Sequence, residues 1–219
     1  MAVCDPTLEC EEVLLAAGAS LVIGCDEVGR GAIAGPVAVG MCAVDGVRPL
    51  PHGLRDSKML SEKRREVLAP VAAAWAVNWA VGLASPQEVD DLGITACLGL
   101  AGKRALTLLH EAGVGILNCV ILLDGHQDWL NPALATPLRV HTRVKADRDC
   151  GSVAAASVLA KVHRDHLMIA ADAEQPGYGW SGNKGYGSAG HFAAIERLGT
   201  TNQHRQSWLK ASAGHIQNA

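Results

Sequence analysis

Two adjacent acids, Asp26 and Glu27, close an apolar segment and are followed by glycines. Residues 20–26, SLVIGCD, have the composition of a buried strand, where unpaired carboxylates are costly to remove from water. Neighbouring strand residues point to opposite faces, so the strand must end or bulge if both acids are to face one site. Gly29 and Gly31 make such a turn easy. Taken alone, the pair is more typical of a solvated surface turn than of a functional site.

Two further acids stand at the ends of predicted strands. Asp124 closes the apolar run VILLD and precedes a glycine, and Asp147 follows the alternating residues 138–144. Because functional groups gather at the carboxyl ends of strands in open α/β sheets, these acids are expected to converge on the first pair. Clustered carboxylates repel one another unless a cation compensates, and oxygen-only ligands suit Mg²⁺ or Mn²⁺. Four acids could hold two such ions, the arrangement used for in-line phosphoryl transfer.

One glycine pattern points to a different chemistry. Residues 29–34, GRGAIA, match the G-x-G-x-x-A fingerprint of dinucleotide-binding proteins. That fingerprint requires a helix directly afterwards, whereas residues 36–44 continue as a second apolar strand. The two acids at its mouth would also repel a pyrophosphate. A dinucleotide site is therefore not expected.

The elements that must position the acids alternate between strand and helix patterns, which indicates a mixed α/β layer fold. The first two strands, joined by the glycine-rich turn, are typical of a hairpin. Strands are expected over residues 20–26, 36–44, 75–84, 119–125 and 138–144. Helices are expected over residues 8–17, from the N-cap Ser61 to residue 74 with Pro70 near its end or kinking it, from Ser85 to His110 with an interruption at Gly93, and over residues 152–169 and 191–198. The glycine-rich residues 176–190 are expected to form a loop.

The chain has 219 residues, which fits one domain, or one domain with a small appendage. Its formal net charge is -3, yet residues 139–210 carry ten Lys and Arg against six Asp and Glu. Such a charge asymmetry suggests a polyanionic partner, although an ordinary solvated surface would explain it equally well. The net charge excludes a protein that coats nucleic acid non-specifically.

The seven cysteines form no C-x-x-C pair, so a zinc knuckle is not expected. Several lie inside apolar runs, as buried free thiols of a reducing compartment do. The first residues carry no signal-peptide pattern, and no uncharged run reaches the roughly 18 residues that span a membrane. We expect a cytoplasmic protein.

The motifs, taken in order, resemble those of one family, ribonuclease HII. The turn DEVGRG followed by AGPV is highly specific, and the further matches keep the family's order over most of the chain. The matching segments are GCDEVGRGAIAGPVAVG at 24–40, RDSKMLSEKRRE at 55–66, LLDG at 122–125, VKAD at 144–147, SVAAASVLAKVHRD at 152–165 and NKGYGSAGHFAAI at 183–195.

The resemblance implies a ribonuclease H-like fold, an α/β mixed sheet flanked by helices, with a C-terminal helical extension. Residues 1–219 would form a single catalytic unit, with its core at about 18–170 and the extension at about 171–219. The implied activity is an endonuclease that hydrolyses the RNA strand of RNA–DNA hybrids and cuts 5′ of ribonucleotides embedded in duplex DNA. Two-metal-ion hydrolysis with Mg²⁺ or Mn²⁺ would leave 3′-hydroxyl and 5′-phosphate ends. We expect a monomer that binds no membrane, and the sequence names no protein partner.

By position, Asp26, Glu27, Asp124 and Asp147 match the family's catalytic and metal-binding quartet. The resemblance also assigns contacts with the substrate. Those residues are Gly29, Arg30 and Gly31 as the sensor of the ribose 2′-hydroxyl, Tyr186 at the RNA–DNA junction, and Lys58 on the nucleic acid backbone.

The physical properties of these substrate-contact residues agree with the implied roles. Glycines let backbone groups come close to the 2′-hydroxyl, the only local difference between RNA and DNA. Arg30 can hold a phosphate through its fork of donors, and an aromatic ring such as that of Tyr186 can stack on a sugar or base. Without the resemblance, the glycines could serve only the turn and Tyr186 could be a packing residue.

A few positions stand apart from these assignments. Ala32 and Thr200 occupy places where the family often has proline, and neither change removes a ligand. Asp165 lies thirteen residues into the helix predicted from residue 152 and is interpreted as a helix-face charge paired with Arg164 or Lys161.

Two other classes of function remain open. A non-catalytic nucleic-acid-binding protein on the same fold would need a broken acidic cluster, and here all four acids are present. A metal-dependent phosphatase for small substrates would need neither the GRG turn nor the basic C-terminal third. A duplex with one ribonucleotide separates the three hypotheses.

Overall fold

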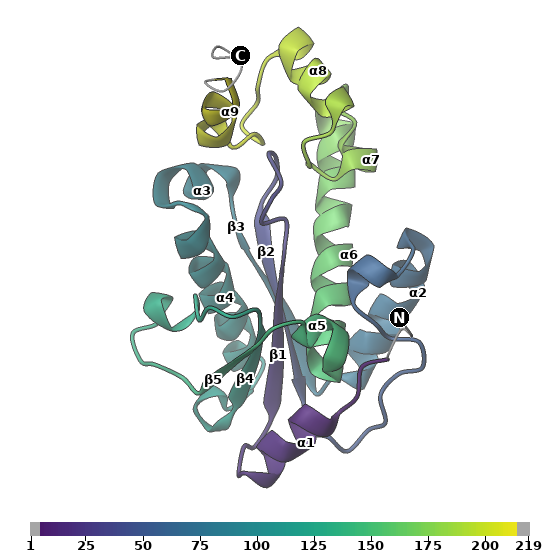
Figure 1. Ribbon diagram of the computed structural model, residues 1–219, viewed down its shortest axis with the longest axis vertical. Helices are drawn as coiled ribbons and strands as arrows, with labels where there is room; N and C mark the ends of the chain where they lie inside the picture. Colours follow the sequence, from purple (N-terminus) through teal and green to yellow (C-terminus); the bar gives the residue numbers. More distant parts are fainter. Residues whose placement is uncertain (1–4, 214–219) are drawn as a thin grey trace.

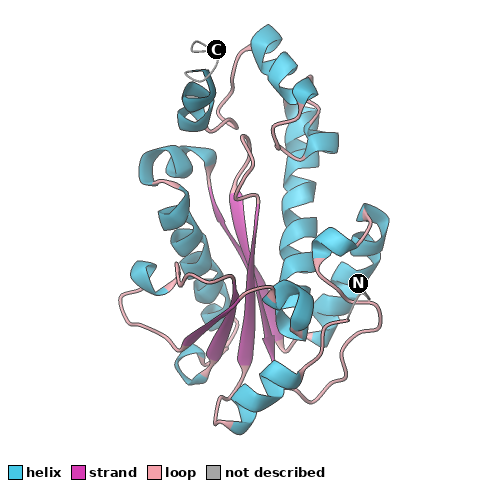
Figure 2. Cartoon of the chain, viewed as in Figure 1, coloured by secondary structure: helices cyan, strands magenta, loops and turns pink. Residues whose placement is uncertain are grey.

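A five-stranded mixed sheet forms the centre of the protein (Figures 1 and 2). The computed structural model describes residues 5–213. The strands are β1 (Val22–Val28), β2 (Val37–Val44), β3 (Asn78–Ala84), β4 (Val120–Asp124) and β5 (Val140–Arg143), in the spatial order β3-β2-β1-β4-β5. β1 pairs antiparallel with β2, which confirms the hairpin, and parallel with β4 on its other side. The central strand therefore joins an antiparallel half to a parallel half.

Helices cover both faces of this sheet, as the amphipathic patterns predict (Figure 2). The α-helices are α1 (Glu9–Ala16), α2 (Glu62–Trp75), α3 (Pro86–Leu92), α4 (Ile94–Glu111), α5 (Ala146–Asp149), α6 (Gly151–Glu174), α7 (Trp180–Asn183), α8 (Ala189–Leu198) and α9 (Gln206–Ala213). Short 3-10 turns are η1 (Ser57–Met59), η2 (Ile116–Asn118) and η3 (Asn131–Ala133). One apolar core lies between the sheet and α4, and a second lies between the sheet and α6 with α2. This arrangement confirms the predicted α/β class with a C-terminal helical extension, of which residues 214–219 lie outside the described part.

Glycines on the central strands let helices lie directly on the backbone of the sheet. A Cβ atom on Gly24 would lie 2.2 Å from the carbonyl carbon of Ser152, and one on Gly40 would lie 2.5 Å from the carbonyl oxygen of Ala156. Both contacts come from α6, whose first half is rich in alanine. α6 is thus held close to β1 and β2 at the level of the acidic residues.

Several predicted boundaries shift in the structure. The strand expected over 75–84 begins only at Asn78, because α2 continues through Pro70 to Trp75 and buries that ring against the sheet. The loop expected over 176–190 contains the short helix α7, and α6 runs to Glu174. The interruption at Gly93 is confirmed, since its φ of 80° separates α3 from α4.

The described residues also bear on the cysteines and on membrane crossing. Six cysteines within residues 5–213 are free thiols and five of them are buried, as predicted, while Cys4 lies outside the described part. Among the helices of residues 5–213, none is long and apolar enough to cross a membrane.

The close contact between α6 and β1 predicts a cost for Gly24→Ala. The added methyl group meets backbone atoms that have no room to move, so the free energy of unfolding should fall by about 2 kcal/mol, the usual scale of overpacking. Thermal unfolding followed by circular dichroism measures the change. Gly115→Ala is the matched control, because nothing lies within 4 Å of a Cβ there, and it should change stability by less than about 1 kcal/mol. A Gly24→Ala protein as stable as the control would contradict the packing described.

Candidate active site

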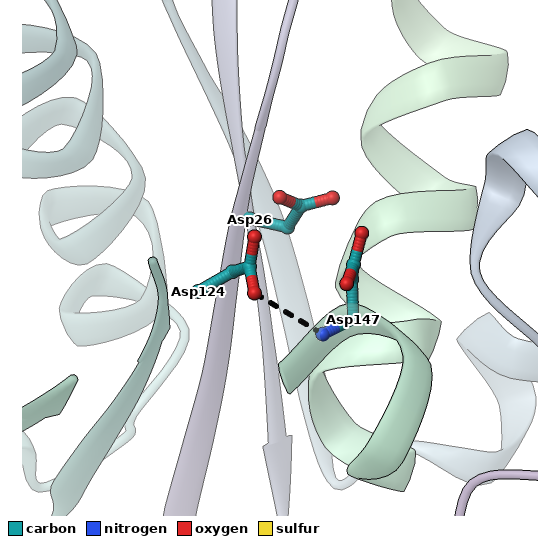
Figure 3. Close-up of side chains that lie close together, drawn as sticks. All are labelled: Asp26, Asp124 and Asp147. Carbon is teal, nitrogen blue, oxygen red and sulfur yellow. Dashed lines mark hydrogen bonds between the residues drawn. The ribbon is translucent and has the colours of Figure 1, made fainter. Parts of the chain in front are cut away.

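Three elements bring aspartates together at the ends of the parallel strands (Figure 3). Asp26 comes from β1, Asp124 is the last residue of β4, and Asp147 lies in α5. One carboxylate oxygen from each lies within 4.8 Å of the others. The convergence predicted from strand ends is therefore observed for these three acids.

Asp124 also fixes the position of the helix that carries Asp147. Its Oδ1 accepts a hydrogen bond of 2.7 Å from the backbone N–H of Ala146 and a longer one of 3.5 Å from that of Asp147. A carboxylate at the start of a helix satisfies N–H groups that have no partner in the first turn. Lys145, in the left-handed region with φ 63°, provides the sharp turn from β5 into α5.

Burial disfavours the charged form of the acids in this cluster. Asp26 is 2% exposed, and its Oδ2 atom has no hydrogen-bond partner within the described part of the chain. Burial raises the pKa of Asp26 well above its usual range; Ser157 and Lys58 lower it in part, and the charges of Glu27 and Asp147 add smaller upward contributions. Burial, followed by the charge of Asp147, also raises the pKa of Asp124.

Lys58 supplies a positive charge at the rim of the cluster. Its Nζ donates a hydrogen bond of 3.0 Å to Asp147 Oδ2. The η1 turn that carries Lys58 is capped by Asp56, whose Oδ1 accepts from the Lys58 N–H. Partial burial opposes the charge, but Asp26 and Asp147 outweigh it and raise the pKa of Lys58. The sequence predicted a contact between Lys58 and nucleic acid; the structure adds a contact with an acid of the cluster.

The residues present fit a divalent cation. All three ligand groups are carboxylates, which suit Mg²⁺ or Mn²⁺ rather than a softer metal. The unpartnered Oδ2 of Asp26 is a buried acceptor that a cation would satisfy. A positive ion between the three groups would also offset the burial and the like charges that raise the pKa of Asp26 and Asp124.

Glu27 lies outside this three-residue cluster. The sequence predicted that β1 would end or bulge at Asp26. Instead, β1 stays in regular pairing with β2 through Val28. Asp26 therefore lies on the same face of the sheet as Gly24, the face that α6 covers. Glu27 lies on the opposite face with Ile23 and Cys25, which belong to the core between the sheet and α4. Pairing with β4 stops at Cys25, so this part of β1 has no parallel neighbour, and both acids line one cleft.

That cleft also contains the other predicted contact residues. Its volume is about 200 Å³, and it is lined by Asp26, Glu27, Val28, Gly29, Arg30, Gly31, Ser57, Lys58, Asp124, Lys161 and Tyr186. Arg30 reaches back to Glu27, with Nη1 3.3 Å from Oε1. The Tyr186 ring is 39% exposed at the wall of the cleft. Segments distant in the sequence thus present acids, glycines, cations and an aromatic ring to one space.

Sequence reasoning missed several residues around the cleft. Lys161 and Ser57 line it. Both lie in segments that match the family motifs, but neither was predicted as a site residue. Asp165 pairs with Lys161, at 2.6 and 2.8 Å, which confirms one of the two alternative partners predicted for it, and the residue is buried. Arg164 instead turns inward and is fully buried. A spacing of four residues on α6 signalled the Lys161–Asp165 pair, but no pattern signalled the burial of Arg164.

A mixed sheet flanked by helices, with carboxylates gathered at the ends of its parallel strands, is a ribonuclease H-like fold with a candidate site for a divalent cation. The family model of Ribonuclease HII matches residues 23–211. The chain is 47% identical to Ribonuclease HII of Streptomyces griseus over 212 residues, covering 95% of this chain and 86% of that protein. It is 41% identical to that of Vibrio cholerae El Tor Inaba over 203 residues, 93% of each chain. The chain belongs to the ribonuclease HII family, and it is therefore an RNase H endonuclease.

Solved structures agree with the fold. The ribonuclease H2 of Pyrococcus horikoshii superposes with a TM-score of 0.69 at 23% identity, over 91% of this chain and 100% of that one. The RNase HII of Archaeoglobus fulgidus, solved in complex with PCNA, superposes with a TM-score of 0.64 at 22% identity, over 86% of this chain and 95% of that one. Bst-RNase HIII in complex with Mn²⁺ superposes with a TM-score of 0.62 at 25% identity, over 83% of this chain and 64% of that one. The first two likenesses show a shared fold.

The electrostatics of Asp26 predict that Asp26→Asn stabilises the metal-free protein at neutral pH. Burial raises the pKa of Asp26 in the folded state above its value in the unfolded chain. Between these two pKa values the folded protein holds a proton on Asp26 that the unfolded chain has released, so the free energy of unfolding falls as pH rises through this range. Removing this charge should raise the free energy of unfolding by about 1–3 kcal/mol, the scale of an unsatisfied buried polar group. Urea unfolding in a chelator, at about pH 5 and about pH 7.5, compares wild type with the variant. An equal stability difference at both pH values would contradict the assignment.

Proposed function

We propose that this enzyme cuts duplex DNA on the 5′ side of embedded ribonucleotides, as well as the RNA strand of long hybrids, and leaves 3′-hydroxyl and 5′-phosphate ends. The observation that carries the proposal is the shared cleft, in which Asp26, Glu27 and Asp124 face the same space as the GRG turn. Cleavage next to a single ribose requires a scissile phosphate and a 2′-hydroxyl to be read together. A cleft that held only acids would not provide such discrimination.

In the proposal, Asp26, Asp124 and Asp147 hold one divalent ion, and Glu27 with one of them holds a second. When bound, Mg²⁺ or Mn²⁺ would supply an activated water and neutralise charge on the leaving 3′-oxygen. The chain itself keeps the acids aligned: β1 and β4 fix the first two, and the Asp124 contact with Ala146 N–H fixes α5. The Mn²⁺ in the Bst-RNase HIII structure supports this choice of ions.

The proposal assigns substrate binding to the groups around the acids. The backbone of Gly29, Arg30 and Gly31 would contact the ribose 2′-hydroxyl, since no side chain on the glycines intervenes. The exposed Tyr186 ring would stack at the RNA–DNA junction. Lys58, partly exposed beside the acids, would meet a backbone phosphate.

The two rival functions fit the site less well. A protein that only binds nucleic acid gains nothing from a buried carboxylate with an unsatisfied oxygen, which costs stability. A phosphatase for small substrates has no use for an open cleft with a glycine turn beside the acids. We further propose that residues 1–219 act as one catalytic unit, a monomer in the cytoplasm, and the free thiols of the described part support a reducing compartment.

Substitution of the acids tests the proposed mechanism. Asp26→Asn and Asp124→Asn should each lower kcat by more than about 100-fold on a duplex with one ribonucleotide, because each removes a charged ligand worth several kcal/mol. Binding of the duplex and the folded circular dichroism spectrum should persist. Glu111→Gln, an exposed acid at the end of α4, is the control and should retain full activity. Full activity of either aspartate variant with Mg²⁺ would refute the site assignment.

Metal removal tests the cofactor and separates the rivals. In a chelator, wild type should bind the single-ribonucleotide duplex without cutting it, and excess Mg²⁺ or Mn²⁺ should restore a nick 5′ of the ribonucleotide. Gel analysis of end-labelled strands locates the nick and the ends. Binding without a nick in any metal would favour the binding-only rival, and no interaction with the duplex would favour the phosphatase.

A further inference from the structure

Two arginines lie fully buried behind the GRG loop, which comprises residues 29–36. Arg164 comes from α6 and Arg205 directly precedes α9, and both have 0% exposure. Within the described part of the chain, neither guanidinium forms an ion pair with a carboxylate. Burying an unpaired charge costs several kcal/mol, so a fold that keeps two of them next to a substrate-binding loop needs a reason.

Arg205 holds the two ends of the GRG loop together. Its Nη2 donates to the carbonyl oxygens of Gly29, at 2.8 Å, and Gly35, at 3.1 Å, and its Nη1 donates to that of Arg30, at 3.1 Å. Its own backbone N–H donates to the carbonyl of Ile33, at 2.9 Å. The planar fork of an arginine is needed to reach several carbonyls at once.

Arg164 ties the same loop to the segment that carries Tyr186. Its Nε donates to the Pro36 carbonyl at 2.8 Å, its Nη2 to that of Ala34 at 3.0 Å, and its Nη1 to that of Lys184 at 2.8 Å. The guanidinium also lies 5.6 Å from the centre of the Tyr186 ring. In Figure 1, this loop lies at the end of the β1–β2 hairpin, close to the C-terminal segments.

Gly29 is part of this arrangement. Its φ is +82°, and a Cβ atom there would lie 2.1 Å from Nε of Arg164. The glycine therefore makes room for the guanidinium behind the loop, in addition to allowing the turn.

These contacts determine which way the peptide groups of the turn face. In a trans peptide the N–H points opposite to the C=O. Because the carbonyls of Gly29 and Arg30 point to Arg205, the N–H groups of Arg30 and Gly31 point away from it, on the side where both residues line the cleft. No group of residues 5–213 accepts a hydrogen bond from these two N–H groups. Two free donors thus face the space beside the acids.

We propose that Arg205 and Arg164 are positioning residues that hold the GRG loop with the N–H groups of Arg30 and Gly31 free to bind the ribose and its phosphate, and that their charge strengthens those two donors. The inference rests on the proposed function of the cleft. It explains why the loop is held by cations rather than by neutral donors: the substrate brings the negative charge that the buried guanidinium groups lack. Burial lowers the pKa of Arg205 to about 10, so it remains a cation at neutral pH.

Arg205→Lys tests the proposal, because lysine keeps the charge and loses the fork. The matched control is Arg48→Lys, since Arg48 also donates to two carbonyls, those of Ala74 and Trp75, far from the loop. Thermal unfolding first sets a temperature at which every protein is folded. Two quantities are then measured: kcat with Mg²⁺ on a duplex with one ribonucleotide, and the affinity for the matched all-DNA duplex by fluorescence anisotropy.

We expect Arg205→Lys to lower kcat by about 100-fold, the effect of misplacing a binding group by about 1 Å, with affinity for all-DNA duplex within about twofold of wild type. Arg48→Lys should change neither quantity. A folded Arg205→Lys protein with wild-type kcat would overturn the proposal, and so would equal losses of cleavage and of DNA affinity. Should Arg205→Lys not fold, Arg164→Lys decides by the same criteria, because it holds other carbonyls of the loop. A wild type that does not nick the duplex would refute the proposed function itself, whereas an active wild type with an unaffected variant refutes only the role of the arginines.

Discussion

Carboxylates of like charge are held within a few ångströms of one another at the centre of this protein, and one of them, Asp26, is buried with an oxygen that no described group satisfies. The burial of these charges, together with their mutual repulsion, is the constraint on which the rest of the site depends. The fold resists it through rigid supports: α6 lies on the glycine backbone of β1 and β2, and Asp124 caps the helix that carries Asp147. A cation supplied from outside the cluster would stabilise this assembled arrangement.

Cationic side chains lie near the acids both at the rim of the cluster and in the protein interior. Lys58 contacts Asp147 at the rim, where it is open to solvent and to substrate phosphates. Arg164 and Arg205 lie deeper, behind the GRG loop, and among the described residues their side-chain hydrogen bonds go only to backbone carbonyls. Lys58 is largely exposed beside the cluster, whereas each of the two buried arginines is held by several hydrogen bonds. The cleft therefore combines a metal-attracting side and an anion-attracting side, as a phosphodiester substrate requires.

The sequence was sufficient for the parts of the fold that follow from local patterns. Strand ends placed Asp26 and Asp124 together, and the capping box at Ser85 and the glycine at 93 marked the helices α3 and α4. It did not place Glu27 on the opposite face, because whether β1 ends or continues depends on its pairing with β2. It also could not reveal the buried arginines, since donors to distant carbonyls leave no periodic pattern.

We infer that the aspartate cluster binds a divalent cation, and anomalous diffraction from crystals of the protein grown with Mn²⁺ tests this inference most directly. We expect a manganese peak bound by carboxylate oxygens of Asp26, Asp124 and Asp147, at the roughly 2.0–2.2 Å typical of small divalent ions. Crystals in which these three side chains bind no manganese, at a concentration that supports cleavage, would contradict it.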